Sequence, residues 1–187
     1  MVYLSKGIVL GKPSGTAVSI SHCGALRKLE GDQAKVWLSG QYGPNVTENA
    51  AQDAALEQLT LLGVAEPGDE SDDRAIFRLL ANCSICPVRS GTSPSMLTRA
   101  ERRSLKWIRH AGLRLTMAEL AYLSELGVKP TPELLGVQNR QVLTEAIYSA
   151  ATIYDGILET MMEKSAVRDC VVFSVLGLLR KRKIFLI

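Results

Sequence analysis

The sequence has few aromatic side chains, and it has no long apolar run. Phe, Trp and Tyr together make up 5% of its 187 residues. A core with so few rings must consist mainly of Leu, Ile, Val and Ala, a mixture that suits helices better than a large sheet. The longest apolar candidate, Cys170 to Leu179, has ten residues, well short of the roughly 18 that a membrane-spanning helix needs. With no signal segment at its N-terminus, the chain is expected to be cytoplasmic and without a membrane partner.

Catalytic motifs are also missing. The sequence contains no nucleophile elbow, metal-binding helix motif or dinucleotide-binding loop. It has two histidines, and His110 lies at the basic end of a predicted helix rather than in a polar cluster. We therefore expect a non-enzymatic protein without a cofactor.

The four cysteines are expected to be reduced in the cytoplasm. Cys83 and Cys86 have the spacing of metal ligands, but a zinc site needs three or four ligands. His22 and Cys23 could complete a site only if the fold brought them close. We expect small cysteines packed in the core and no metal. A metal- or redox-responsive regulator that uses Cys83 and Cys86 stays open as an alternative.

The net charge of +3 is unevenly distributed along the chain. Residues 1–90 contain 8 Lys and Arg against 10 Asp and Glu, whereas residues 91–187 contain 14 against 9. Attraction to nucleic acid is therefore expected from the second half. The sign changes across a Ser-Gly-Thr-Ser-Pro-Ser stretch, which is typical of a linker. These observations predict an N-terminal domain over 1–89, a linker over 90–97 and a C-terminal domain over 98–187.

In the first half, Val2 to Ile20 is predicted to be extended, and a short helix is predicted over 33–39. Thr47 or Asn49 is a suitable N-cap for a second helix over 50–62, and Gly63 is suited to end it. The pattern then predicts two strands, 64–66 and 75–80, on either side of an acidic turn.

A helix that ends at Gly and is followed by a hairpin resembles the recognition helix and wing of the winged-helix superfamily. The resemblance implies that Thr47, Asn49 and Gln52 reach base edges in the major groove. The alternative is that Thr47 and Asn49 are ordinary helix caps. Three carboxylates nearby would repel phosphate: Glu48, Asp53 and Glu57.

In the second half, Thr98–Glu101 and Thr116–Glu119 have the pattern of capping boxes. The first is expected to open a helix whose Leu105 and Ile108 face inward while its arginines face mostly outward. A third helix is predicted to start at Thr131, and two more helices are predicted over 138–164 and 166–179. A strand over 184–187 is predicted to follow them. The long 138–164 helix carries more apolar surface than a small domain covers, which predicts a homodimer. Its apolar stripe consists of Leu143, Ile147, Ala150, Tyr154, Ile157, Leu158 and Met161.

The basic run near the C-terminus consists of Arg180, Lys181, Arg182 and Lys183. It could neutralise about three or four phosphates. Arg168, in the first turn of the preceding helix, is a further candidate for DNA contact. The alternative is that these cations only complement the dipole at a helix C-terminus.

The sequence as a whole predicts an α+β, mainly helical protein built as tandem winged-helix-like domains. Its expected function is binding of double-stranded DNA, as in a small transcriptional regulator. The alternative is a winged-helix protein–protein interaction module that does not bind DNA. Salt dependence distinguishes the two, since binding to phosphates weakens steeply as salt is added.

Overall fold

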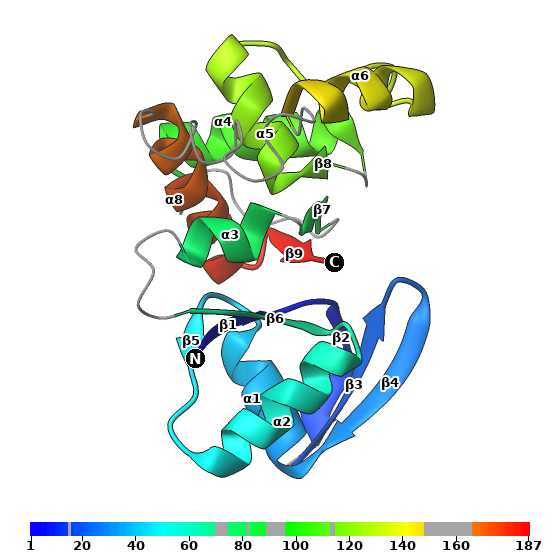
Figure 1. The fold of residues 1–187 in the computed structure, drawn as a ribbon, viewed down its shortest axis with the longest axis vertical. Coiled ribbons are helices and arrows are strands. Elements are labelled where there is room, and N and C mark those ends of the chain that lie inside the picture. The colour runs from blue at the N-terminus through cyan, green and yellow to red at the C-terminus, as the bar shows by residue number, and fades with distance from the viewer. Residues whose placement is uncertain (15, 70–74, 82, 89–95, 113–114, 148–165) are drawn as a thin grey trace. The chain divides into compact units, whose positions relative to one another are not determined.

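The computed structural model describes residues 1–14, 16–69, 75–81, 83–88, 96–112, 115–147 and 166–187 (Figure 1). The chain divides into two compact units. Unit 1 comprises Met1–Cys83 and Leu179–Ile187, and unit 2 comprises Ser84–Leu178. The sequence had assigned 98–187 to one C-terminal domain, whereas the residues from Leu179 onward pack with the N-terminal unit. Most of the expected linker over 90–97 lies outside the described residues.

Unit 1 contains two small antiparallel sheets. In one, β1 (Val2–Ser5) lies between β5 (Asn45–Val46) and β6 (Ala65–Gly68). The other is a meander of β2 (Ile8–Ser14), β3 (Ala17–His22) and β4 (Ala25–Glu30). The turn between β3 and β4 places Cys23 and Gly24 at φ values of 49° and 82°, which matches the twist of the flanking strands. The extended N-terminal region is thus confirmed.

The core of unit 1 lies under α1 (Gly31–Gly40) and α2 (Ala50–Leu61). Trp37 of α1 is completely buried, and its indole Nε1 donates to the Lys6 carbonyl at 3.2 Å. Leu56 and Leu59 of α2 are also fully buried in this cluster. The ring hydroxyl of Tyr3 in β1 donates to the Val36 carbonyl at 3.0 Å, so both polar atoms of these buried aromatic residues have partners.

The helix predicted over 50–62 is confirmed, but the prediction of a two-stranded wing after it is wrong. Gly63 has a φ of 72° and the chain enters β6, as expected. However, β6 pairs with β1, and the predicted strand over 75–80 is instead the helix α3 (Ala75–Ala81). The buried residues of α3 are Phe77, Leu79, Leu80 and Ala81. Three of them, Phe77, Leu80 and Ala81, have the spacing of one helix face. The structure therefore establishes an α+β fold, and tandem winged-helix-like domains are not confirmed.

Unit 2 is largely helical. Its elements are β7 (Ser84–Pro87), α4 (Arg99–Ala111), β8 (Leu115–Thr116), α5 (Met117–Leu126), α6 (Val137–Ile147) and most of α8 (Ala166–Arg180), and β7 pairs with β8. Both predicted capping boxes are present, at the starts of α4 and α5. The predicted start at Thr131 is wrong: its hydroxyl accepts from the Leu134 amide at 3.2 Å, but only a turn forms there, and α6 begins at Val137.

Two contacts between helices brace unit 2. Arg140 of α6 binds Glu119 of α5 through two hydrogen bonds of 2.7 Å, and the Glu119 side chain is 5% exposed. Gly177 of α8 lies against Glu101 of α4, so closely that an added Cβ would lie 3.2 Å from the Glu101 carboxyl carbon and even nearer to one of its oxygens. A side chain at this position would have to displace the Glu101 carboxyl group.

The remaining C-terminal predictions have different outcomes. Helix α8 is confirmed, as is the strand that follows it, β9 (Ile184–Leu186), whose Leu186 carbonyl accepts from the Gly7 amide at 2.6 Å. Of the apolar stripe expected to form a dimer, Leu143 and Ile147 are buried within the chain, while the other members lie outside the described residues. None of the helices in the described part of the chain is both long and apolar enough to cross a bilayer.

Candidate functional site

Among the described residues of unit 2, the outer face of α4 carries the densest group of exposed cations. This helix begins at Thr98, whose hydroxyl accepts from the Glu101 amide at 3.1 Å while Glu101 Oε2 accepts from the Thr98 amide at 2.7 Å. Leu105, Ile108 and Ala111 are buried along its inner face. The cap and this apolar stripe fix the helix and leave its cations outside. They are Arg99, Arg102, Arg103, Lys106 and Arg109, and all are exposed.

The cations of α4 lie on two adjoining flanks within an arc of about 120°, given 100° per residue, and Arg99 lies only about 20° from Lys106. Arg102, Lys106 and Arg109 form one flank, which we call the outer flank. Arg99 and Arg103 form the other, where the Arg103 guanidinium lies over the Trp107 ring at 4.8 Å from its centroid. The only acidic residue of α4, Glu101, is 5% exposed. No ion pair joins any of the five cations to a carboxylate among the described residues.

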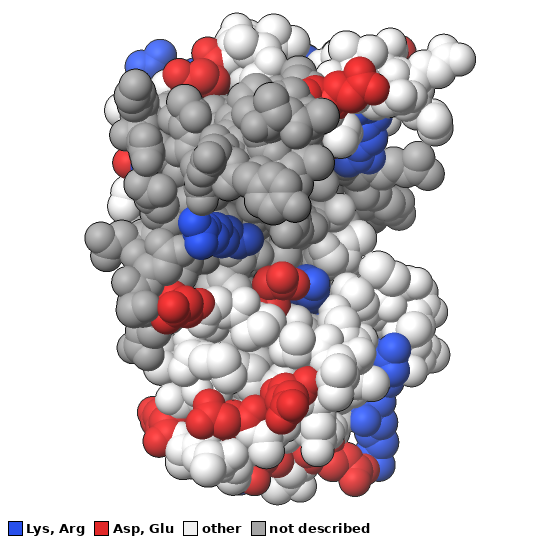
Figure 2. Space-filling model, in the orientation of Figure 1, with Lys and Arg blue, Asp and Glu red and all other residues white. Residues whose placement is uncertain are grey.

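Helix α2, which the winged-helix resemblance predicted to be the recognition helix, has a different surface from α4. Its sequence contains no Lys or Arg, and Figure 2 shows acidic side chains over this part of unit 1. The three predicted base-contacting residues take part in local hydrogen bonds instead. Thr47 donates to Asp53 at 2.6 Å, Asn49 accepts from the Gln52 amide at 3.0 Å, and Gln52 Oε1 accepts from the Glu48 amide at 2.8 Å. These are the contacts of a helix N-terminus, which was the alternative left open for Thr47 and Asn49.

The predicted basic run is split by the fold. Arg180, Lys181 and Arg182 are exposed, whereas Lys183 is 5% exposed and its Nζ has no hydrogen-bond partner among the described residues. Arg182 adopts a φ of 55°, and its guanidinium lies 4.5 Å from the centroid of the Tyr42 ring. The run therefore presents three cations to solvent from unit 1, in a turn that leads into β9.

Arg168, the last of the predicted phosphate contacts, lies in the first turn of α8 within unit 2. Its guanidinium makes two hydrogen bonds to the neighbouring Asp169 carboxylate, at 2.6 and 2.8 Å. The Arg168 side chain is 16% exposed. Its charge is thus already matched by a carboxylate, and it belongs to unit 2, whereas the basic run belongs to unit 1.

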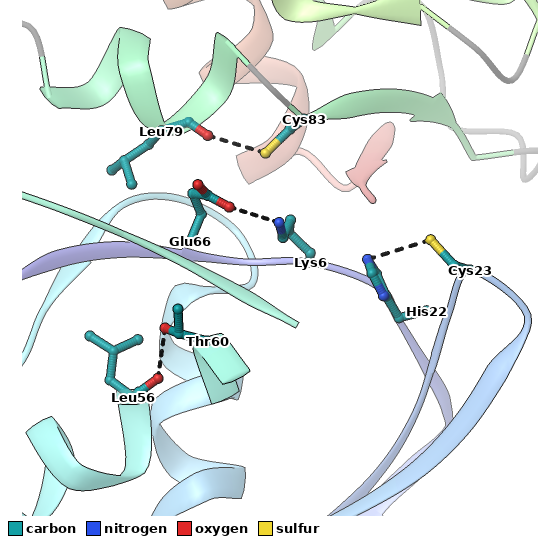
Figure 3. A network of polar contacts seen from close by, with 8 residues as sticks. All are labelled: Lys6, His22, Cys23, Leu56, Thr60, Glu66, Leu79 and Cys83. Atoms are coloured by element: carbon teal, nitrogen blue, oxygen red, sulfur yellow. Dashed lines mark hydrogen bonds and ion pairs between the residues drawn. The ribbon is translucent and has the colours of Figure 1, made fainter. Parts of the chain in front are cut away.

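Figure 3 shows the surroundings of the predicted metal-ligand candidate Cys83. Its thiol donates to the Leu79 carbonyl at 3.1 Å, and burial raises the pKa of Cys83 to about 11. Cys86 is buried as well. A thiol held protonated is a poor ligand, and the described residues contain no group of three or more His, Cys, Asp or Glu that could hold a metal ion. Packing in the core accounts for both side chains.

His22 and Cys23 form a separate polar pair at the β3–β4 turn of unit 1 (Figure 3). The Cys23 sulfur lies 3.7 Å from His22 Nε2. Partial burial, and then the positive charges of Lys6 and Arg27, lower the pKa of His22. Lys6 itself is paired with Glu66 at 2.8 Å. The arrangement keeps His22 neutral and does not assemble an acid, a base and a nucleophile in one cleft.

Comparisons with known proteins provide no relative on which to base a function. No protein-family model, curated protein or solved structure matches the chain. Function therefore has to be argued from the charged and hollowed surfaces of each unit.

Proposed function

We propose that this protein binds double-stranded DNA through the outer flank of α4, as a small non-enzymatic DNA-binding regulator. The observation that supports the proposal is the exposed row of Arg102, Lys106 and Arg109 on a helix whose only carboxylate is buried and engaged in its cap. These cations form no ion pair with a carboxylate among the described residues, which leaves them available to neutralise phosphates. This sequence-independent attraction supplies much of the affinity of proteins for DNA.

The dimensions of α4 fit this role. It contains 13 residues, which corresponds to a length of about 20 Å at 1.5 Å per residue. A helix about 10–12 Å across fits a B-DNA major groove about 12 Å wide. Cations three and four positions apart lie about 5–6 Å from one another, so one flank can follow a single phosphate strand. Arginines on such a helix are also the side chains that most often recognise guanine.

The experiment that tests the proposal removes the charge without disturbing the fold. In the Arg102→Gln, Lys106→Gln, Arg109→Gln triple variant, binding of a random-sequence duplex should weaken. The slope of log K against log salt should become shallower by about 2.7, at roughly 0.9 per lost phosphate contact. Fluorescence anisotropy of a labelled duplex across a salt series measures both quantities.

The matched control removes three exposed lysines from unit 1, in the Lys12→Gln, Lys28→Gln, Lys35→Gln variant. It loses the same formal charge and should keep the native salt slope. An Arg180→Gln, Lys181→Gln, Arg182→Gln variant tests whether the basic run contributes in addition. Equal losses in the α4 variant and the lysine control would show that only net charge matters, and the proposed interface would be wrong.

A second candidate function, a protein-interaction module, is favoured by a specific feature of unit 1. A groove of about 430 Å³ runs along α2, with Asp53 and Glu57 beside the apolar residues Leu61 and Pro67. Leu61 is 83% exposed, and a helix with no cations suits a protein partner better than DNA. A partner held there should be released by Leu61→Asp and should respond only weakly to added salt. This candidate replaces the first if the native protein binds no duplex even at low salt.

A further inference from the structure

A second groove lies between α4 and α8 of unit 2, on the side of α4 that carries Trp107 and next to the outer flank. It has a volume of about 580 Å³, within the range of roughly 300–1,000 Å³ that is typical of small-molecule sites. Trp107 contributes to its wall from α4, and Val167, Cys170 and Val171 from α8. Arg99 and Arg103 also line it, one helical turn apart.

The two helices that border the groove are in contact with each other beyond its lining. At Gly177 the absence of a side chain lets α8 contact Glu101 of α4 directly. The polar residue Ser174 of the groove is 4% exposed and donates to the Cys170 carbonyl within its own helix at 2.7 Å. Its hydroxyl therefore already has a partner, and most of the remaining α8 wall is apolar.

We propose that this groove binds an apolar molecule carrying a single anionic group such as a carboxylate. The apolar wall would bury the hydrocarbon part, while Arg99 and Arg103 would bind the anion. Arginine suits this role because its guanidinium presents paired donors that match a carboxylate. Arg103 is already stacked on Trp107, so part of the cost of ordering its side chain is met before the ligand arrives.

The site adjoins the proposed DNA interface but uses different arginines. Arg103 lies about 60–120° around the helix axis from the three outer-flank residues, given 100° per residue, whereas Arg99 lies about 20° from Lys106 at the border of the two flanks. Binding of the small molecule can be measured in the absence of DNA, so the proposal stands or fails independently of the DNA-binding function. Decanoate is a suitable probe because it combines a ten-carbon chain with one carboxylate.

Two exposed cysteines can show whether the groove is occupied, with Cys170 as the reporter and Cys23 as the control. Cys170 is exposed and lines the groove, Cys23 is exposed in unit 1, and Cys83 and Cys86 are buried. Decanoate should slow alkylation of Cys170 by iodoacetamide and leave the rate at Cys23 unchanged, as measured by mass spectrometry of digested protein. Decyltrimethylammonium, which has the same chain and the opposite charge, should protect Cys170 much less.

The variants test the arginines themselves. Arg99→Gln with Arg103→Gln should weaken decanoate binding about tenfold or more, since a charge-assisted hydrogen bond contributes at least that much. Arg102→Gln with Arg109→Gln removes two charges from the outer flank of the same helix, where neither residue lines the groove, and should leave decanoate binding unchanged. Trp107 emission gives an independent titration, because the other tryptophan, Trp37, is fully buried in unit 1.

Three results would overturn the proposal. One is an absence of Cys170 protection and of any Trp107 change at about 1 mM decanoate, the weak end of measurable binding. Another is equal protection of Cys170 by decyltrimethylammonium, which would show that the groove binds hydrocarbon chains without selectivity for anions. The third is unchanged decanoate affinity in a folded Arg99→Gln, Arg103→Gln variant.

Discussion

Helices α2 and α4 are built in the same way and present opposite surfaces. Each begins at a side-chain N-cap and buries one apolar stripe, and they contain 12 and 13 residues respectively. Yet α2 has no Lys or Arg, while α4 has five. Capping and periodicity therefore establish that a helix forms, and only the charge on its solvent face indicates what it can bind.

The difference in surface charge between α2 and α4 does not appear in the net charges of the two units. Unit 1 contains 11 Lys and Arg against 10 Asp and Glu, and unit 2 contains 11 against 9. The totals are almost equal, but unit 2 concentrates five cations on one short helix. Long-range attraction depends on such local concentration more than on the sum.

Replacing the tryptophan of each unit should give the largest difference between them. Trp37→Ala removes a ring that is 0% exposed and should lower the free energy of unfolding by about 3–5 kcal/mol. Trp107→Ala, at the edge of a groove, should cost about 1 kcal/mol or less. Urea denaturation followed by circular dichroism measures both, and equal costs would mean that Trp107 belongs to a packed core.

Breaking one ion pair in each unit should give the next largest difference. Arg140→Met leaves the buried Glu119 carboxylate without its bidentate partner and should cost about 3 kcal/mol. Lys6→Met breaks a pair whose side chains are 17% and 33% exposed and should cost about 1 kcal/mol or less. Thermal denaturation provides the comparison. Adding Glu119→Gln to Arg140→Met should recover part of the loss, and full additivity of the two costs would contradict the proposed coupling.

Glycine substitutions should separate close packing in unit 2 from backbone conformation in unit 1. Gly177→Ala should cost about 1–2 kcal/mol, because overpacking against Glu101 outweighs the gain of up to about 1 kcal/mol in helix propensity. Gly177→Val should cost more. After α2, Gly63 has nothing within 4 Å of an added Cβ and a φ of 72°, so Gly63→Asn should be tolerated better than Gly63→Ala. Chemical denaturation of the four variants would test this order.

Similar or smaller effects are expected at the two helix caps. Asn49→Ala should cost about 1 kcal/mol, and Thr98→Ala up to about 2 kcal/mol because it also removes half of a reciprocal capping box. Differential scanning calorimetry resolves such shifts. A larger loss at Asn49 than at Thr98 would show that the α2 cap, together with Thr47 and Asp53, is the stronger of the two.

Local signals in the sequence predicted helix starts and ends well. The capping boxes at Thr98 and Thr116, the cap at Asn49 and the left-handed Gly63 were all found from short patterns whose physics is local. The error at 75–80 has a different cause. Six consecutive residues without strict alternation fit a strand or a buried helix equally well, and the pairing of β6 with β1 depends on residues some sixty positions away.

The candidate sites were harder to predict than the helices. The arginines of α4 were expected to face outward, but the sequence could not show that no carboxylate would pair with them. The groove beside α8 is lined by residues of α4 and α8, two helices whose groove residues are separated by most of unit 2. Lys183 belonged to an evenly basic run in the sequence, and only the turn at Arg182 shows that it points inward.

The division of the chain has a consequence for synthesis. Unit 2 is inserted into unit 1, because the chain leaves unit 1 after Cys83 and rejoins it at Leu179. On the ribosome, every residue of unit 2 is translated before the segment that carries Leu186, whose carbonyl accepts from the Gly7 amide. The unit that begins the chain therefore cannot complete its last backbone hydrogen bonds until the inserted unit has been translated, although N-terminal domains generally fold first during synthesis.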